Sequence, residues 1–430
     1  MALKKTNKNI GIIGSGISGL ACAYFLADKG YSVTIYEREK GTGGLAGSAQ
    51  VNGVPIEMFY HHFFSSDTEL LKMAKELGVY DKIHFYESSV GMYIDKKLYP
   101  FTTPLDLLRF TPLSFIDRIK MGLIALYFTR RADWSGLEKW TCKEFFDYLR
   151  APKLYEIMWK PLLEMKFGEY ADTVPATFLW GRINPRGRSR KGTGEQLGYF
   201  DNGYHTFFSA LEKAVTKKGV EIKYESVEEL IPDESGCKVR TIKKTYPHDA
   251  VIFTGSNVLL TRMCKNLPAS FVRKSSQIQY QAINCMILEM KKSVSPYYWL
   301  NAVDKDISFI GFIEHTNLVP YAMYDRHVMY VFNYLQASNP IYTMPEEKVF
   351  ELYAKDIKKI FPHFDKKDVI HWQLARNPFA TPIYNGKYSE KMPPIEISKT
   401  LFLANTSQVY PEDRNVNNGI VLAKKVVKLI

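Results

Sequence analysis

Short apolar runs and amphipathic segments alternate at the start of the chain. Residues 9–13 (NIGII) are mostly apolar, and residues 31–36 (YSVTIY) form a second run of strand-forming residues. Between them, residues 20–27 predict a helix that closes at Lys29-Gly30. Apolar runs of this length on either side of a helical segment predict two parallel strands joined by a crossover helix.

The same kinds of element recur further along the chain. Residues 204–218 predict a helix, and residues 219–224 and 249–255 predict strands. Near the end, residues 400–405 predict a strand, and the sequence Asn417-Asn418-Gly419 opens a helix that continues towards Ile430. Strand and helix patterns of this kind thus recur in three separated parts of the chain.

Two long insertions separate these parts and have patterns of their own. In residues 89–197, the side chains of Ile116, Ile119, Leu123 and Leu126 recur at helical spacing, so we expect a helical insertion. The second insertion, residues 269–387, contains strand-like runs at 282–290 and 328–335 and a helical pattern at 346–360. Together they predict a second domain with a helical part and a sheet part.

A glycine-rich motif follows the first strand. Gly14, Gly16 and Gly19 form a G-x-G-x-x-G sequence. Gly14 makes the tight turn, Gly16 lets a pyrophosphate approach the backbone, and Gly19 lets the helix pack closely on the strand. The first N–H groups of that helix favour phosphate. Glu37 ends the second strand, where an acidic side chain binds ribose hydroxyls. The predicted dinucleotide site comprises Gly14, Ser15, Gly16, Ile17, Ser18, Gly19 and Glu37.

The segment that follows resembles the flavin-side extension of the glutathione-reductase-type flavoproteins. More narrowly, residues 37–48 (EREKGTGGLAGS) resemble the superfamily that contains monoamine oxidase, protoporphyrinogen oxidase, phytoene desaturase and UDP-galactopyranose mutase. The resemblance covers nearly the whole chain and implies that the dinucleotide is FAD. It assigns to the cofactor Arg38, Gly43, Gly44, Leu45, Ala46, Val227, Thr254, Gly255, Asn405, Asp413, Arg414, Asn418 and Gly419.

The fold that this resemblance implies is α/β, a glutathione-reductase-type FAD-binding Rossmann domain with an inserted α+β substrate-binding domain. The FAD-binding domain is discontinuous and consists of residues 1–88, 198–268 and 388–430. The substrate domain consists of residues 89–197 and 269–387.

Three histidines are candidates for chemistry outside the cofactor. His61 and His62 occupy the place where the superfamily carries a histidine-containing stretch near the flavin ring. Each either orients substrate and moves a proton, or is packed beneath the flavin with no proton to move. His315 leaves an apolar run and either lines the substrate cavity or belongs to a plain turn. The histidines show no metal-ligand spacing, so no metal site is predicted.

Two basic segments have open interpretations. Residues 113–128, flanked by Arg118, Lys120, Arg130 and Arg131, either lie on a membrane or at the mouth of a lipid tunnel, or form an ordinary packed helix. Residues 182–191 hold five positive charges in ten residues. They either grip a phosphate or pyrophosphate or form a solvated loop.

Charge and cysteine content narrow the setting. Lys and Arg number 57 and Asp and Glu 45, a net charge of +12 that suits an anionic partner. Five scattered cysteines without a CxxC pair favour a reducing, cytoplasmic compartment. No apolar run approaches the ~20 residues of a membrane span, so membrane contact is expected to be peripheral, at the inner face. No motif supports nucleic-acid binding.

The predicted function is that of an FAD-dependent oxidoreductase with hydride transfer between flavin N5 and an apolar, lipid-linked or cell-surface-glycan-precursor substrate. Only one G-x-G-x-x-G is present, so NAD(P)H, if it is the redox partner, visits the substrate cavity; a quinone is the other candidate. Two alternatives remain open. One is a non-redox, reduced-flavin sugar-nucleotide mutase similar to UDP-galactopyranose mutase, and the other is a flavin-bound binding protein.

Overall fold

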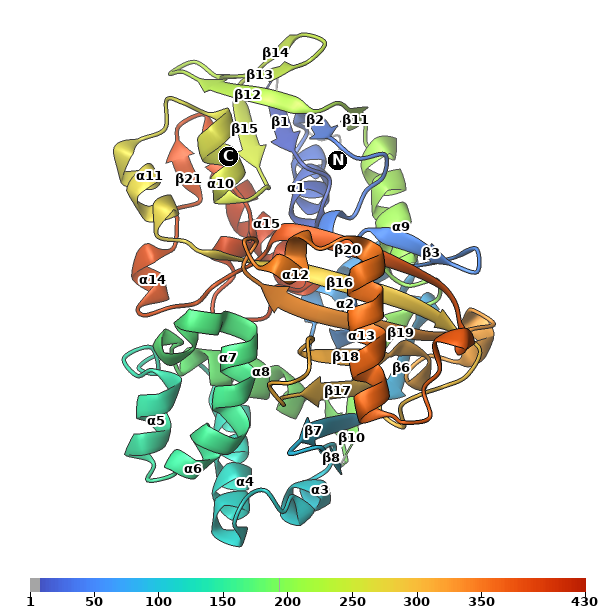
Figure 1. Ribbon diagram of the computed structural model, residues 1–430. Helices are drawn as coiled ribbons and strands as arrows, with labels where there is room; N and C mark the ends of the chain where they lie inside the picture. The colour runs from blue at the N-terminus through green and yellow to red at the C-terminus, as the bar shows by residue number, and fades with distance from the viewer. Residues whose placement is uncertain (1–7, 193) are drawn as a thin grey trace.

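The three separated α/β segments meet in one sheet. The computed structural model describes residues 8–192 and 194–430. Its six-stranded sheet has the order β11-β2-β1-β15-β22-β21, parallel except for the edge strand β21 (Figure 1). The strands are β1 (Asn9–Ile13), β2 (Ser32–Glu37), β11 (Glu221–Tyr224), β15 (Ala250–Phe253), β22 (Leu401–Leu403) and β21 (Glu396–Ser398). Each of the apolar runs that predicted a strand of the α/β unit forms one of these strands.

Three helices cover this sheet, and their packing depends on small residues. They are α1 (Ile17–Asp28), α9 (Tyr204–Lys217) and α15 (Val416–Val427), and their apolar faces share one core with the sheet. A Cβ added at Gly419 in α15 lies 2.5 Å from Cγ2 of Ile17 in α1. Glycine at this position therefore lets the C-terminal helix lie directly against the first helix.

A second, seven-stranded sheet lies below the first in Figure 1. Its order is β20-β16-β19-β18-β17-β7-β8. The strands are β7 (Val90–Ile94), β8 (Lys97–Pro100), β16 (Tyr280–Met290), β17 (Trp299–Ala302), β18 (Gly311–Glu314), β19 (His327–Leu335) and β20 (Val369–Pro382). The helix α13 (Glu346–Ile360) packs on one face, and the other face packs against β4, β5 and β10.

The first insertion is not wholly helical, which corrects the sequence expectation. Its first two strands, β7 and β8, extend the second sheet, because β7 pairs with β17 in parallel. The helices follow: α3 (Pro104–Arg109), α4 (Phe115–Arg130), α5 (Cys142–Tyr148), α6 (Pro152–Leu154), α7 (Lys160–Phe167) and α8 (Thr177–Arg188). They form the lower end of the molecule around a core of their own (Figure 1).

The arginine-rich segment is not the solvated loop that one of its two interpretations predicts. Residues 182–188 are the last part of α8 and not a solvated loop. The Asn184 amide donates to the carbonyl oxygens of Phe128 at 3.0 Å and Arg131 at 3.1 Å, at the end of α4. The indole of Trp180 donates to the same Arg131 carbonyl at 3.1 Å. These bonds fix α8 on α4 and hold its arginines in place.

A short antiparallel sheet connects the two halves. It has the order β5-β10-β6, formed by β5 (Phe63–Phe64), β10 (Gly194–Phe200) and β6 (Ile83–Glu87), and β9 (Arg190–Lys191) pairs with β10. Strand β10 crosses the predicted boundary between residues 197 and 198, so this junction is continuous structure; the domain boundaries themselves stay a prediction. The remaining elements are β3 (Ser48–Val51), β4 (Val54–Glu57), α2 (Thr68–Glu76), β12 (Val227–Pro232), β13 (Cys237–Thr241), β14 (Thr245–His248), α10 (Asn257–Met263), α11 (Ala269–Ser276), α12 (Pro340–Thr343) and α14 (Tyr388–Lys391).

Candidate active site

Two glycine-rich loops meet beyond the carboxyl ends of β1 and β2. Gly14 has a φ of +102°, a conformation that glycine adopts without steric cost. The Gly43 N–H donates to the Ser15 carbonyl at 3.0 Å, and Gly16 and Gly43 form an isolated parallel bridge. Ile17 and Ser18 start α1 beside this bridge. The loop 14–19 and the turn 43–46, which includes Leu45 and Ala46, therefore form one surface.

That surface has the geometry of a pyrophosphate cradle. A Cβ added at Gly16 meets nothing nearer than Gly44 Cα at 3.8 Å, whereas one added at Gly19 lies 2.0 Å from the carbonyl oxygen of Gly14. Gly16 caps α1 without a side-chain hydrogen bond, and the first turn contains no acidic residue. Open space beside bare backbone and available N–H groups fits the phosphates of a dinucleotide. Gly16 thus leaves room for a ligand, and Gly19 allows packing.

Glu37 lies at the edge of the cradle. Its carboxylate accepts from the Ser15 N–H at 2.8 Å and from the Ser15 hydroxyl at 2.7 Å, and its other oxygen accepts from the Glu39 N–H at 2.9 Å. It occupies the end of β2, where an acid is predicted to contact ribose. Arg38 is exposed and pairs with Glu39 at 2.9 Å, so the described contacts direct it away from the cradle.

The predicted cofactor residues after β15 and β22 are occupied by protein contacts. The Thr254 hydroxyl donates to the Ile13 carbonyl at 2.7 Å. The amide of Asn405 donates to the Gly255 carbonyl at 2.7 Å and to the side-chain oxygen of Asn257 at 2.8 Å. These bonds hold the loops that flank the cradle, and the contact of these residues with FAD stays a prediction.

Three further predicted cofactor residues have different surroundings. The Asn418 amide donates to the Asp413 carbonyl at 2.7 Å and holds the loop before α15. Gly419 is the contact point between α15 and α1, as described above. Val227 starts β12 in a separate three-stranded sheet. Their contact with FAD stays a prediction.

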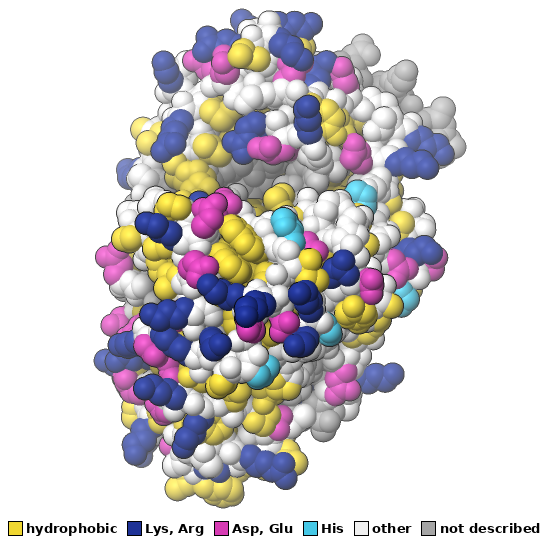
Figure 2. Space-filling view, turned by 45° about the vertical axis from the view of Figure 1, so that its right-hand side comes forward, with side chains coloured by type: hydrophobic (Ala, Val, Ile, Leu, Met, Phe, Trp, Pro, Cys, Tyr) yellow, Lys and Arg dark blue, Asp and Glu magenta, His cyan; other side chains and the backbone are white. Residues whose placement is uncertain are grey.

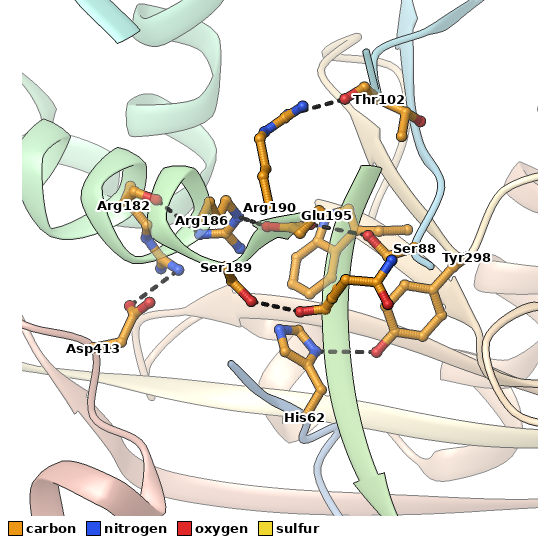
Figure 3. Close-up of polar contacts among 12 residues, drawn as sticks. His62, Ser88, Thr102, Arg182, Arg186, Ser189, Arg190, Glu195, Tyr298 and Asp413 are labelled. Atoms are coloured by element: carbon orange, nitrogen blue, oxygen red, sulfur yellow. Dashed lines mark hydrogen bonds and ion pairs between the residues drawn. The ribbon is translucent and has the colours of Figure 1, made fainter. Parts of the chain in front are cut away.

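Four cationic side chains surround the carboxylate of Asp413. Arg182 Nη1 lies 3.2 Å from Asp413 Oδ1 (Figure 3). Arg186, one turn along α8, lies 3.5 Å from Glu195 Oε1 and points to the same region (Figure 3). Lys166 from α7 and Arg414, next to Asp413, complete what we call the basic cluster: Lys166, Arg182, Arg186 and Arg414.

The pKa directions follow this arrangement. Burial raises the pKa of Asp413, but Arg182 and the other cations lower it by more, so it lies below its ordinary value. Burial lowers the pKa of Lys166 well below its ordinary value, and Arg182 and Arg414 lower it further. Lys166 is 9% exposed, and its ammonium has no hydrogen bond or ion pair with any residue in the described ranges. The cluster therefore holds more positive charge than the protein itself offsets.

Aromatic rings line the same region. The Lys166 ammonium lies 5.3 Å from the ring centre of Tyr334 and 5.4 Å from that of Phe178. The hydroxyl groups of Tyr60 and Tyr334 are 3.1 Å apart. Arg414 lies 5.5 Å from the ring centre of Tyr384. Rings beside uncompensated cations suit a ligand that is apolar at one end and anionic at the other.

His62 faces the basic cluster and His61 does not contact it. His62 Nδ1 lies 3.0 Å from the Tyr298 hydroxyl (Figure 3). Burial, and after it the charge of Arg186, lowers the pKa of His62 to about 3, so its imidazole is neutral near pH 7. His61 Nδ1 lies 2.6 Å from the Phe59 carbonyl, which only accepts, so Nδ1 carries the proton. Which of them moves a proton stays a prediction.

The structure separates His315 from this group. Its Nε2 lies 3.3 Å from the Tyr324 hydroxyl, and its ring packs against Tyr199 and Tyr330. The preceding Glu314 accepts backbone N–H groups of Val294 and Ser295. His315 thus lies within a packed polar network, and the described contacts give it no place in a substrate cavity.

Sequence reasoning missed Lys166 and the tyrosines. A lysine on a helix ordinarily faces water, whereas Lys166 on α7 is buried against Phe178 of α8 and Tyr334 of β19. Tyr334, on β19, was part of a predicted strand without a predicted role.

An open cleft of about 760 Å³, lined by Asp95, Lys96, Glu156 and Asp304 among others, shares no residue with the cradle or the basic cluster.

Comparison with known proteins identifies the family. Residues 17–411 match the family described as flavin containing amine oxidoreductase, and the chain belongs to this family. The predicted superfamily, the fold class and the FAD cofactor are thereby confirmed, and the residues of the cradle fit that cofactor. Among the residues that the structure describes, no group of His, Cys, Asp and Glu is arranged to hold a metal ion.

Individual relatives are more distant. Coproporphyrinogen III oxidase of Staphylococcus aureus (strain NCTC 8325 / PS 47) is 27% identical over 266 residues, which is 54% of this chain and 57% of that protein. A probable UDP-galactopyranose mutase of Klebsiella pneumoniae is 22% identical over 333 residues, 75% of this chain and 77% of that protein. A chloroplastic/mitochondrial protoporphyrinogen oxidase 2 of Arabidopsis thaliana is 30% identical over 121 residues, which is 27% of this chain and 24% of that protein. The chain thus spans little more than half the length of the first of these relatives and about a quarter of the last.

A solved structure shares the whole fold. The putative protoporphyrinogen oxidase from Exiguobacterium sp. 255-15 has a TM-score of 0.77 at 15% identity, with 99% of this chain and 98% of that chain covered. At this identity the likeness shows the fold alone.

Proposed function

We propose that the protein is an FAD-dependent oxidoreductase that acts on an amphiphilic substrate with an anionic group, of the lipid-linked or cell-surface-glycan-precursor class. When bound, FAD supplies a hydride acceptor or donor at N5. The observation that carries the proposal is the buried Lys166 beside Arg182 and Arg414, next to aromatic rings and without a protein anion of its own.

The charge balance of the cluster favours an anionic ligand. Asp413 and Glu195 offset two cations, and Glu195 is held by the Ser88 hydroxyl at 2.9 Å. A buried cation without a partner costs free energy, which it avoids by giving up its proton. A phosphate or carboxylate beside Lys166 raises the pKa of its side chain again, because the anion stabilises the ammonium form. Ligand binding is therefore coupled to proton uptake at Lys166.

The neighbouring groups have separate tasks in this proposal. Asp413 orients Arg182, so that the guanidinium presents its remaining N–H groups to the ligand. The hydroxyl of Tyr334, whose ring lies 5.3 Å from the ammonium, and the hydroxyl of Tyr60 beside it bind a neutral oxygen of the substrate. His62, neutral and held at Nδ1 by Tyr298, has Nε2 left for a proton of the substrate.

The reduced-flavin mutase is the second candidate, because the same cluster also fits a nucleotide pyrophosphate. One of the relatives above is named a probable UDP-galactopyranose mutase and aligns over 75% of this chain. A mutase of this kind has no net electron transfer to a second substrate. NAD(P)H or a quinone is the proposed redox partner for the oxidoreductase, and for the mutase a reductant is needed only to prepare the flavin.

An anaerobic titration tests the proposal. The purified, flavin-loaded protein is mixed with dodecyl phosphate, pyrophosphate or UDP, and the flavin absorption band is followed with and without NADH or NADPH. We expect dodecyl phosphate to perturb the band, and the Lys166→Met variant to need at least about tenfold more of it. A matched control is Lys305→Met, an exposed lysine outside the cluster.

The outcomes separate the candidates. A perturbation by dodecyl phosphate that depends on Lys166, together with oxidation of the reduced flavin by a quinone, supports the oxidoreductase. A response to UDP alone, with conversion of UDP-galactopyranose and no net redox change, supports the mutase. A flavin band that no anion perturbs contradicts an anionic substrate and favours a binding protein.

A further inference from the structure

The lower end of the molecule carries an unusual apolar surface. Eight large apolar side chains of α3 and α4 are exposed there, and we call six of them the apolar tip: Leu105, Phe115, Ile116, Ile119, Leu123 and Leu126. Phe115 is 65%, Ile116 68% and Leu123 61% exposed. Figure 2 shows hydrophobic side chains gathered at this end, with basic side chains beside them. Contiguous exposed apolar side chains mark an interaction surface.

Helix α4 is apolar on two opposite faces. Met121, Ile124 and Phe128 point into the helical core, which accounts for the stability of the helix. Ile116 and Leu123 lie on the other face, and no other part of the described chain covers them. An apolar helix face ordinarily packs against an apolar partner surface, and this second face of α4 has none among the described residues. The sequence spacing of Ile116, Ile119, Leu123 and Leu126 predicted the helix, but it marks the exposed face and not the core.

The charges around the tip have one dominant sign. Five cationic residues lie between residues 104 and 131: Arg109, Arg118, Lys120, Arg130 and Arg131. Of the acids that neighbour the apolar side chains, Asp106 accepts the N–H of Thr103 and Asp117 the hydroxyl of Ser114 at the starts of α3 and α4. Two carboxylates thus stand against five cations between residues 104 and 131, so the tip presents apolar groups within a rim of net positive charge.

We propose that the apolar tip docks on the surface of an anionic lipid bilayer, with α4 lying in the interface. The apolar side chains enter the acyl boundary while the basic rim meets lipid phosphates. No helix within the described ranges is long and apolar enough to cross a bilayer, so the contact is one-sided. A second copy of this chain fits less well, because a two-fold contact through the tip brings two basic rims together.

The tip has a direct mechanical connection to the basic cluster. Asn184 fixes α8 on the end of α4, and the close approach of Gly187 to Thr129 leaves no room for a side chain between the two helices. The same α8 carries Arg182 and Arg186. A docked α4 therefore holds the anion-binding helix next to the bilayer. The membrane proposal rests on the surface alone and does not depend on the reaction.

Vesicle co-sedimentation tests the docking. The full-length, flavin-loaded protein is mixed with vesicles of equal parts phosphatidylglycerol and phosphatidylcholine, or of phosphatidylcholine alone. We expect binding to the anionic vesicles that weakens as salt is added, and at least about tenfold weaker binding for the Ile116→Glu/Leu123→Glu variant. The matched control is Ile242→Glu, a residue 78% exposed in the turn between β13 and β14, at the opposite end of the molecule (Figure 1).

A second measurement does not depend on affinity. All five native cysteines are buried, so a Leu123→Cys variant takes an environment-sensitive dye at one site. We expect its emission to shift to the blue on anionic vesicles, whereas a dye at Ile242→Cys stays unchanged. Equal binding of wild type and the double glutamate variant contradicts the proposal. So does a wild-type dimer in solution that the double variant abolishes, since the tip is then a contact between copies.

Discussion

Two buried polar networks lie near the centre of the molecule and differ in how they treat charge. Around Glu57, the Tyr199 hydroxyl donates to one carboxyl oxygen at 2.6 Å and the Tyr204 N–H to the other at 2.5 Å. Tyr324 continues this network from Tyr199 to His315. The acceptors of Glu57 are filled by protein donors, and the network joins β4, β10 and α9 across the two halves.

The basic cluster is incomplete by comparison. Arg182 and Arg186 have partners in Asp413 and Glu195, whereas Lys166 and Arg414 form no ion pair with any residue in the described ranges. A network that the protein closes contributes to stability, whereas one that it leaves open costs stability and binds ligand. We therefore expect the closed network to stabilise the fold and the open cluster to be available to a ligand.

We expect the largest effect on cofactor binding in the glycine loop, where Gly16 leaves room for a ligand and Gly19 allows packing within the protein. Gly16→Val places a side chain in open space beside the cradle, so we expect a folded protein without FAD, with affinity reduced by orders of magnitude. Gly19→Val collides with the Gly14 carbonyl and should fail to fold. Flavin absorbance and far-UV circular dichroism distinguish them. A yellow Gly16→Val protein contradicts the cofactor site.

The next largest effect is expected on stability, when Glu57 is replaced in the closed network. Glu57→Leu leaves the Tyr204 N–H and the Tyr199 hydroxyl without an acceptor, and we expect the free energy of unfolding to fall by about 3 kcal/mol. Glu57→Gln keeps an acceptor and should lose much less. Urea unfolding of both variants measures the difference. Equal stability of the leucine variant and wild type is evidence against a structural role for the network.

A substitution in the basic cluster should stabilise the protein, in contrast to one in the closed network. Lys166→Met removes a buried cation without a partner, so we expect the free energy of unfolding to rise by about 1–2 kcal/mol while turnover falls. Thermal unfolding and steady-state kinetics on one preparation check both. A variant that is less stable than wild type shows that Lys166 is part of the structure, not a ligand site.

A pH-dependent effect tests His315 within the closed network. Burial lowers its pKa to about 3, so the folded protein holds it neutral while the unfolded chain binds a proton near pH 6.5. Between these values the unfolded state binds more protons, and stability falls as the pH falls. His315→Phe should reduce this slope by up to about 1.4 kcal/mol per pH unit, measured by urea unfolding from pH 6.5 to pH 4.5. An unchanged slope means that His315 is accessible to water.

The sequence predicts the cofactor half better than the substrate half, for a physical reason. The Gly14–Gly19 loop and Glu37 belong to a local unit whose function follows from its backbone shape. The charge on Lys166 becomes significant only through its distance to Arg414, which is 248 residues away in the chain. Hydrophobic spacing predicted the α4 helix but not its orientation, because Met121 and Ile116 are both apolar and only packing decides which side faces the core.

The contact of Gly419 with Ile17 also sets an order of events during synthesis. The two residues are 402 positions apart, so at roughly 5–20 residues per second the ribosome needs on the order of tens of seconds to bring α15 to α1. Until then the first βαβ unit exposes the apolar side of α1 and lacks the loop that holds Asp413 and Arg414. We expect the nascent chain to capture its cofactor only after α15 has emerged, and to depend on chaperones before that.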